Sequence, residues 1–397
     1  HERPVRLAPM PRPSPGFGTA LRRELNWLER SRWDLALVTL APLVTLVVLG
    51  LMFVQSTARL LPIAVVDADH SPLSRQLVRN LRASAQVEVV AEPVQESEAW
   101  TLARRTDVWA VVIIPAGLQR DALSGQQASV LLYRNAAFYS VGALASRGVS
   151  DAVAALNAQL RPELMRAHNV PAVRLEAPRI QATVLFNPQL SYEWFLEALL
   201  QPGILHVLLS CAVVVALGRD LQAGTLQAWL DTGGGALPAL AAKLAPYVLV
   251  FTAWQLAGTA WLCGWRGWGV HGSLALLAAG QLALYACYAA IAAFVALLVR
   301  DTYTALSAVA LYGGPALTFS DPPLPVIGAP VFTQVWSHVL PFSAYVKLQM
   351  EQMFMGSPAS ASLPWLALMS AVALAMFLLA GLLLRRATRH QLQSSPA

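Results

Sequence analysis

The stretch PGILHVLLSCAVVVALGRDLQAGTLQAWLDTGGGALPALAAK (residues 202–243) decides the fold of this chain. An apolar run over residues 204–217 ends at Gly218-Arg219-Asp220, and a second apolar run begins after Lys243. Two hydrophobic runs joined by a short amphipathic connection predict a hairpin of membrane helices. Arg219 and Lys243 flank the connection, and positive charge beside membrane helices marks the cytoplasmic side. The connection is therefore expected in the cytoplasm.

The connection has the pattern of a short helix, expected over residues 218–231. One helical face can hold four leucines, while the charged residues point to other faces; these leucines are Leu217, Leu221, Leu226 and Leu230. We interpret the segment as a helix that lies across the bundle and that a partner protein can push. The alternative is an ordinary solvated loop between two membrane helices.

Composition supports an integral membrane protein. The chain of 397 residues is 56% hydrophobic and 13% charged, whereas soluble domains have about 25% charged residues. The net charge of +6 comes from arginines near the ends of apolar runs, which fits anionic lipid headgroups. No basic stripe with interleaved aromatic residues suggests nucleic acid, and no cysteine or histidine spacing suggests a metal site.

Taken in order, the chain predicts six membrane helices. Residues 1–16 are expected to form a disordered cytoplasmic tail, 17–33 an amphipathic helix in the membrane surface, and 34–54 the first span. Five further spans fall within residues 192–390, at about 194–217, 244–263, 274–299, 303–319 and 363–384. The proline-rich residues 320–341 are expected to form an outer re-entrant segment, and 391–397 a tail. Arginine placement puts both termini in the cytoplasm.

Residues 55–191 are polar enough for a soluble domain outside the cytoplasm. Strands are expected at 63–66, 87–90, 108–114 and 129–133, with helices at 71–84, 94–105 and 138–168 and an extended return over 173–186. Ser71 followed by Pro72 predicts the start of the first of these helices. Strands that alternate with helices indicate an inserted α/β domain.

Several motifs, in this order, resemble the permease of a type-2 ABC exporter with a large periplasmic domain between its first two spans. The motifs are 63–71 with Ser74-Arg75, then 111–118, Asn187-Pro188, Pro202-Gly203, Arg219-Asp220, Gly224-Thr225-Leu226, Lys243 and Pro341-Phe342-Ser343. Each motif is short, and their order along nearly the whole chain carries the resemblance.

The resemblance implies a bacterial inner-membrane permease that works with cytoplasmic ABC ATPase subunits and a second permease copy. No glycine-rich phosphate loop followed by Lys-Ser or Lys-Thr occurs in the chain, so ATP and Mg²⁺ are expected on the partner ATPase, with no cofactor and no catalytic residue here. The residues expected to couple the two proteins are Arg219, Asp220, Gly224, Thr225, Leu226 and Trp229. A periplasmic membrane-fusion adaptor is a further partner that related permeases often use.

Four polar residues are candidates for a substrate path. His206 and Ser210 lie one turn apart within an apolar span, where an ionisable group suggests function; a hydrogen bond to a neighbouring helix is the alternative. Glu193 and Glu197 share one face and could form an acidic vestibule for a cationic substrate, or a solvated rim. Apolar spans favour a lipophilic or amphipathic substrate such as a drug or lipid.

A second class of function stays open at this point. The chain could be a membrane-anchored sensor or assembly protein that binds a ligand or protein through its outer domain. A permease would copurify with an ATPase subunit, whereas a sensor would be stable alone. The amphipathic connection over 218–231 favours the permease.

Overall fold

The computed structural model describes residues 14–53, 60–105, 107–124, 128–134, 139–167, 191, 193–320 and 329–394. These residues belong to two compact units. One unit combines His1–Val54 with Leu185–Ala397, and the other is Gln55–Val184. The predicted tail over residues 1–16 lies mostly outside the described residues, as does the predicted extended return over 173–186.

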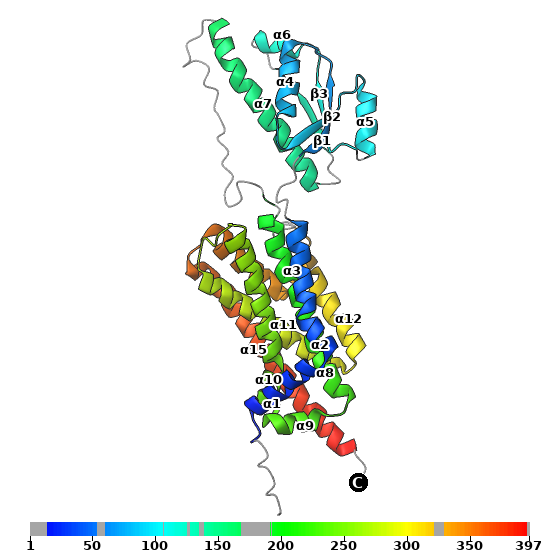
Figure 1. The fold of residues 1–397 in the computed structure, drawn as a ribbon, viewed down its shortest axis with the longest axis vertical. Coiled ribbons are helices and arrows are strands. Elements are labelled where there is room, and N and C mark those ends of the chain that lie inside the picture. Colours follow the sequence, from blue (N-terminus) through cyan, green and yellow to red (C-terminus); the bar gives the residue numbers. More distant parts are fainter. Residues whose placement is uncertain are drawn as a thin grey trace, which may run out of the picture. The chain divides into compact units, whose positions relative to one another are not determined.

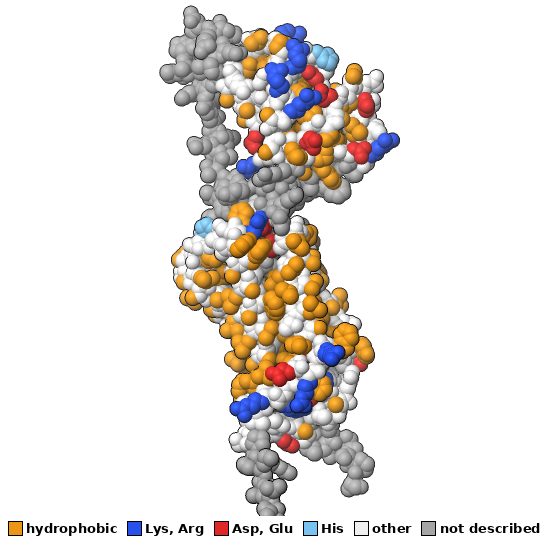
Figure 2. Space-filling model, viewed as in Figure 1, with side chains coloured by type: hydrophobic (Ala, Val, Ile, Leu, Met, Phe, Trp, Pro, Cys, Tyr) orange, Lys and Arg blue, Asp and Glu red, His pale blue; other side chains and the backbone are white. Residues whose placement is uncertain are grey.

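Five helices among the described residues are long and apolar enough to cross a membrane. The first, Arg32–Met52, consists of α2 (Arg32–Val38) and α3 (Leu40–Met52), and the second, Glu193–Gln222, consists of a π-helical turn (Glu193–Glu197) and α8 (Ala198–Gln222). The third, Ala236–Trp265, contains α10 (Ala236–Ala260). The last two are α11 (Leu274–Val299) and residues Ala359–Thr388 of α15 (Ala359–Ser394). Hydrophobic side chains cover the visible face of this unit between its two ends (Figure 2). Such a surface suits contact with lipid.

The span expected over 303–319 is shorter in the structure. Helix α12 (Thr302–Gly313) has 12 residues, and a 3-10 turn over Gly314–Leu317 follows it. Proline cannot donate a backbone hydrogen bond within a helix, which explains why the regular helix ends just before Pro315. Helices α13 (Val331–Val339) and α14 (Pro341–Gln349) come next, while residues 321–328 of the predicted re-entrant segment lie outside the described residues.

Small residues allow the helices of the membrane unit to pack closely. Helix α11 buries several alanines, including Ala289, Ala292 and Ala293. Gly218 of α8 lies against Thr302 of α12, since a Cβ atom there would come within 2.2 Å of the threonine Oγ1. Close backbone approach of this kind is a common source of van der Waals stabilisation between membrane helices.

The α/β insert predicted after the first membrane helix is confirmed. Its strands β1 (Leu61–Asp67), β2 (Val87–Ala91), β3 (Ala110–Ile114) and β4 (Leu131–Arg134) have the order β2-β1-β3-β4, in which only the β3–β4 pair is antiparallel. The helices are α4 (Pro72–Arg82), α5 (Glu96–Arg104), α6 (Leu118–Leu123) and α7 (Tyr139–Ala167) (Figure 1). The Ser71 side chain caps α4 by accepting a hydrogen bond from the Ser74 backbone N–H.

Candidate functional site

The amphipathic helix α1 (Phe17–Arg30) packs on the membrane bundle beside α9 (Leu226–Gly233) and α10 (Figure 1). Its backbone is joined to α9 by a hydrogen bond of 3.0 Å from the Gly16 N–H to the Thr232 carbonyl oxygen. The inward face of α1 buries Ala20, Glu24 and Leu28. A carboxylate on this face is costly unless charged groups surround it.

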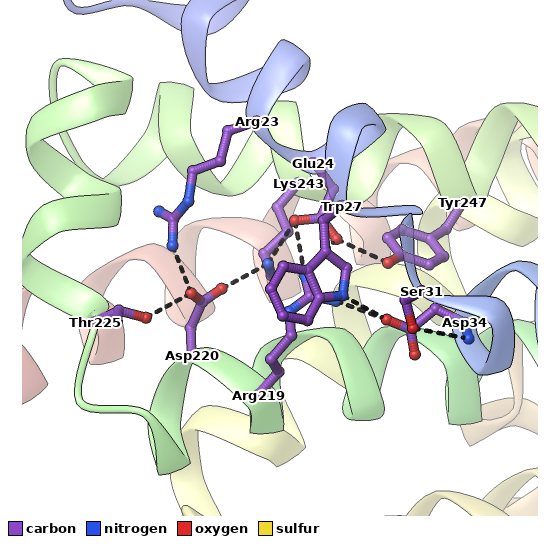
Figure 3. Close-up of polar contacts among 10 residues, drawn as sticks. All are labelled: Arg23, Glu24, Trp27, Ser31, Asp34, Arg219, Asp220, Thr225, Lys243 and Tyr247. Atoms are coloured by element: carbon purple, nitrogen blue, oxygen red, sulfur yellow. Dashed lines mark hydrogen bonds and ion pairs between the residues drawn. The ribbon is translucent and has the colours of Figure 1, made fainter. Parts of the chain in front are cut away.

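Three groups from two other helices surround the Glu24 carboxylate, which is 4% exposed (Figure 3). Arg219 Nη2 of α8 donates to Oε1 at 2.8 Å and to Oε2 at 3.0 Å. Lys243 Nζ of α10 donates to Oε2 at 2.7 Å, and the Tyr247 hydroxyl donates to Oε1 at 2.8 Å. One acidic residue of α1 therefore links α8 and α10.

Asp220 is a second buried carboxylate, one residue after Arg219 on α8. Its Oδ2 accepts a hydrogen bond of 2.7 Å from Lys243 Nζ, so Lys243 bridges Glu24 and Asp220. Its Oδ1 accepts from Arg23 Nη2 and from Thr225 Oγ1, each at 2.7 Å. Thr225 is the residue before α9, and Asp220 therefore ties the start of α9 to α1 and α10 (Figure 3).

A third acid, Asp34 at the start of α2, completes the arrangement. It accepts from Arg219 Nη1 at 2.9 Å and from the Trp27 indole N–H at 2.7 Å. The Arg219 guanidinium carbon also lies 4.4 Å from the Trp27 ring centroid, a distance typical of a cation–π contact. Arg219 thus contacts both α1 and α2.

We call Arg23, Glu24, Asp34, Arg219, Asp220 and Lys243 the inner charge cluster. It contains three acids and three bases, so its formal charges balance. Burial raises the pKa of the Glu24 carboxyl, but Lys243 and then Arg219 lower it by a larger amount. The net result is a pKa below the usual range, which keeps Glu24 ionised at neutral pH.

The structure changes the boundaries of the expected helix over 218–231. Helix α8 continues through Arg219 and Asp220 to Gln222, and α9 begins only at Leu226. Gly224 lies in the turn between them with a φ of +67°, a left-handed conformation that favours glycine. The polar residues stay helical because their charges are paired with α1 and α10.

The six residues expected to couple the chain to a partner fall into three groups. Arg219, Asp220 and Thr225 meet in or beside the inner charge cluster. Leu226 and Trp229 are buried against the bundle, with Lys243 Nζ 5.2 Å from the Trp229 ring centroid. Gly224 is exposed.

Other residues form the exposed surface of α9 and of its connection to α8. Gln222, Ala223, Ala228 and Asp231 are exposed, and they were not among the expected coupling residues.

Sequence reasoning also missed Arg23, Glu24, Asp34 and Tyr247 as members of this site. Glu24 did carry a signal, because it lies four residues from both Ala20 and Leu28. An acid on the apolar side of an amphipathic helix indicates a buried partner.

His206 and Ser210 make hydrogen bonds within the bundle. His206 is fully buried, with Nδ1 2.8 Å from the Pro202 carbonyl oxygen and Nε2 3.3 Å from that of Gly313. Ser210 donates to the His206 carbonyl oxygen at 2.8 Å. A neutral imidazole has one N–H and donates it to one of these two carbonyl oxygens. The contact with Gly313 spans α8 and α12 and is the interhelical contact considered as the alternative for this histidine.

Glu193 and Glu197 are also buried, with 1% and 0% of their surfaces exposed. Glu193 pairs with the Arg266 guanidinium and accepts from the Trp268 indole N–H at 2.9 Å. Glu197 accepts from Gln201 Nε2 at 3.0 Å. Neither residue lies on a solvated rim, and the two side chains have different partners.

Fold and site together define a polytopic membrane protein in which the inner charge cluster lies beside α9, the short helix between two spans. A family model described as ABC-2 family transporter protein matches residues 32–382. The chain belongs to this family, and it is an ABC-2 membrane permease, a transmembrane subunit that is not itself catalytic. Permeases of this family work with ABC ATPase subunits, on which ATP hydrolysis takes place. No curated protein sequence matches the chain.

Proposed function

We propose that this permease exports its substrate when a cytoplasmic ABC ATPase pushes on α9, and that the inner charge cluster transmits the push. The observation that supports this is the path of buried contacts from Thr225 through Asp220 and Lys243 to Glu24. Buried charge-assisted hydrogen bonds are short and directional. A displacement of α9 is therefore passed to α1, α8 and α10 together.

The surface offered to the ATPase is the exposed side of the α8–α9 connection. Gln222, Ala223, Gly224, Ala228 and Asp231 lie on this side, whereas Leu226 and Trp229 face the bundle. The buried residues hold α9 in place, and the exposed ones are available for contact. Arg219 and Asp220 accordingly act inside the permease rather than at its surface with the ATPase.

Cross-linking tests the docking surface. In a full-length chain whose three cysteines are replaced by alanine, Ala228→Cys should cross-link to a copurifying ATPase subunit in a way that depends on nucleotide. Trp265→Cys is the matched control, because Trp265 is 78% exposed and follows α10 at the end away from α9. Equal cross-linking at both positions, or none at Ala228→Cys, would contradict the proposal.

Charge reversal tests the linkage itself. Asp220→Lys and Arg219→Glu should each leave ATP hydrolysis by the assembled complex but abolish its coupling to export. Glu29→Lys serves as the control, since Glu29 is exposed on α1 and outside the cluster. Export at the wild-type rate in the Asp220→Lys variant would refute the role of the cluster.

For topology, we propose six spans in the inner membrane of a bacterium, with both termini cytoplasmic. Helix α12 with its following 3-10 turn would supply the sixth crossing, completed by neighbouring segments. Helix α3 ends at Met52, at the end of the bundle opposite α9 (Figure 1). This supports a periplasmic position for the insert. A protease-accessibility assay on sealed inverted vesicles, whose cytoplasmic face points outward, tests it. Cleavage within residues 55–191 by protease added outside the vesicles would refute it.

For transport, we propose a lipophilic or amphipathic substrate, a dimer of permeases and, as a further partner, a periplasmic adaptor. His206, Ser210, Glu193 and Glu197 remain the candidates for the substrate path, all on the π-helical turn and α8. Because all four are buried in this conformation, a path along them would have to open during transport. His206→Ala should change the substrate range in a compound panel, and an unchanged range would remove this residue from the path.

A further inference from the structure

A cavity of about 280 Å³ lies between α3, α8 and α10, away from the inner charge cluster. Leu46, Val47, Gly50 and Leu51 of α3 form one wall. Val47 is 50% exposed and Leu51 is 70% exposed, on a helix whose outer surface suits lipid. The cavity therefore opens toward the hydrocarbon of the bilayer. Its volume is near the lower end of small-molecule sites, which span roughly 300–1,000 Å³.

A side-chain amide lies in this largely apolar wall. Gln201 of α8 lines the cavity and is 1% exposed. Its Nε2 donates to Glu197 Oε1 at 3.0 Å, and a carboxylate accepts such a bond only from the amide nitrogen. With Nε2 in this bond, Oε1 is the remaining acceptor of the amide. Within the described part of the chain, Gln201 Oε1 has no hydrogen-bond partner.

Gly258 of α10 makes room for this acceptor. A Cβ atom at residue 258 would come within 2.4 Å of Gln201 Oε1, so no larger residue fits without moving the amide. The second oxygen of Glu197, Oε2, is likewise buried without a partner among the described residues. Two buried acceptors without donors cost free energy that a bound donor would recover.

We propose that this cavity binds a small lipophilic amine that enters from the bilayer. The apolar walls take its hydrocarbon body, and Gln201 Oε1 accepts a hydrogen bond from its amino group. An ammonium group fits better than a hydroxyl, because it offers several N–H donors and a positive charge beside the Glu197 carboxyl group. The indole ring of Trp261 also lines the cavity, with Nε1 at 3.6 Å from a Cβ atom placed at Gly50.

Photolabelling tests the site without the ATPase, so its outcome is separate from that of the coupling experiments. The probe is an aryl-alkylamine with a diazirine, and the comparison molecule has a methyl group in place of the amine. Full-length permease in dioleoylphosphatidylcholine nanodiscs should be labelled by the amine on residues 46–51 or 257–261. Labelling by the methyl analogue should be about tenfold weaker, because it cannot donate to Gln201.

Two variants change the cavity at different walls, one on α8 and one on α3. Gln201→Leu removes the acceptor and should weaken labelling by the amine about tenfold, with little effect on the methyl analogue. Gly50→Leu fills the cavity from α3, where a Cβ atom has ordinary contact distance to Trp261 at 3.6 Å, and should block both probes. Gly264→Leu is the control, since a Cβ atom there meets nothing within 4 Å.

Three results would overturn the assignment. The first is equal labelling by the two probes, and the second is labelling that survives both Gln201→Leu and Gly50→Leu in folded protein. The third is loss of labelling when phosphatidylethanolamine is added to the nanodiscs, which would assign the site to a lipid headgroup instead of a free amine.

Discussion

Replacing Lys243 by methionine is the sharpest test of the inner charge cluster. The Lys243 side chain is 2% exposed, and its Nζ lies 2.7 Å from both Glu24 Oε2 and Asp220 Oδ2. Methionine keeps the length and apolar character of the chain but removes the charge. The cluster then holds three acids and two bases, with one uncompensated negative charge buried among α1, α8 and α10.

The expected cost follows from the remaining contacts. Removing one partner of a buried ion pair costs about 3–5 kcal/mol, because the other charge stays buried without compensation. Here Glu24 keeps Arg219 at 2.8 Å, and Asp220 keeps Arg23 at 2.7 Å. Each acid retains one cation, and the cost of Lys243→Met should therefore be near the lower limit, about 3 kcal/mol of unfolding free energy.

A second substitution shows whether charge balance is the cause. Glu24→Gln alone should also destabilise the protein, since it leaves an excess positive charge. In the double variant Lys243→Met/Glu24→Gln, two acids and two bases remain. Its cost should be smaller than the sum of the two single costs by about 1.5 kcal/mol or more, a coupling within the range for residues in one ion-pair network.

The assay is reversible unfolding of the full-length permease in mixed micelles by titration with a denaturing detergent. Lys347→Met is the control, because Lys347 has no ion pair among the described residues and its Nζ lies 4.8 Å from the Trp365 ring centroid. Strictly additive costs, or a Lys243→Met cost no larger than that of the control, would refute the reasoning.

Three further predictions concern other contacts. Lys243 and Arg219 lower the pKa of Glu24 against the effect of burial. The ionised Glu24 carboxylate should therefore contribute fully to stability above about pH 4.5, and this contribution should be lost as the pH falls through the lowered folded-state pKa. Glu24→Gln should flatten this part of the stability–pH curve. Gly218→Ala should cost about 1–3 kcal/mol through overpacking against Thr302, and adding Thr302→Ala should recover much of it, as thermal unfolding of the two variants would show. Asp69→Ala should loosen the turn before α6, because Asp69 Oδ1 accepts from the Gly117 N–H at 2.7 Å; hydrogen exchange at Gly117 should rise in the variant and stay slow if this contact is unimportant.

The sequence allowed the class of fold to be predicted because apolar length and strand–helix alternation are local properties. The apolar runs at 194–217, 244–263 and 274–299 lie inside helices of the structure, and the strand expected at 63–66 lies inside β1. The end of α8 was placed too early, at residue 217. Arg219 and Asp220 look like loop residues by hydropathy, yet pairing with α1 and α10 keeps them helical.

The inner charge cluster could not be predicted in the same way. Glu24, Arg219 and Lys243 are far apart in the chain, and each has an ordinary local explanation: a polar face, a helix end or a cytoplasmic flank. Only tertiary packing brings them together. The same holds for Gln201, which reads as one polar residue beside a proline.

The geometry of the cluster also restricts where a permease of this kind can move. N–H···O hydrogen bonds have donor–acceptor distances of about 2.7–3.2 Å, and Lys243 Nζ lies 2.7 Å from both Glu24 Oε2 and Asp220 Oδ2. A shift of about 1 Å between α1 and α8 would break them and expose buried charge at the cost given above. We therefore expect these helices to move as one body together with α9, which Thr225 ties to Asp220 at 2.7 Å. Distances between spin labels on α1, α9 and α10 should then be equal in nucleotide-free and nucleotide-bound complexes, and a change in the distance from α9 to either of the other two helices would contradict the proposed transmission.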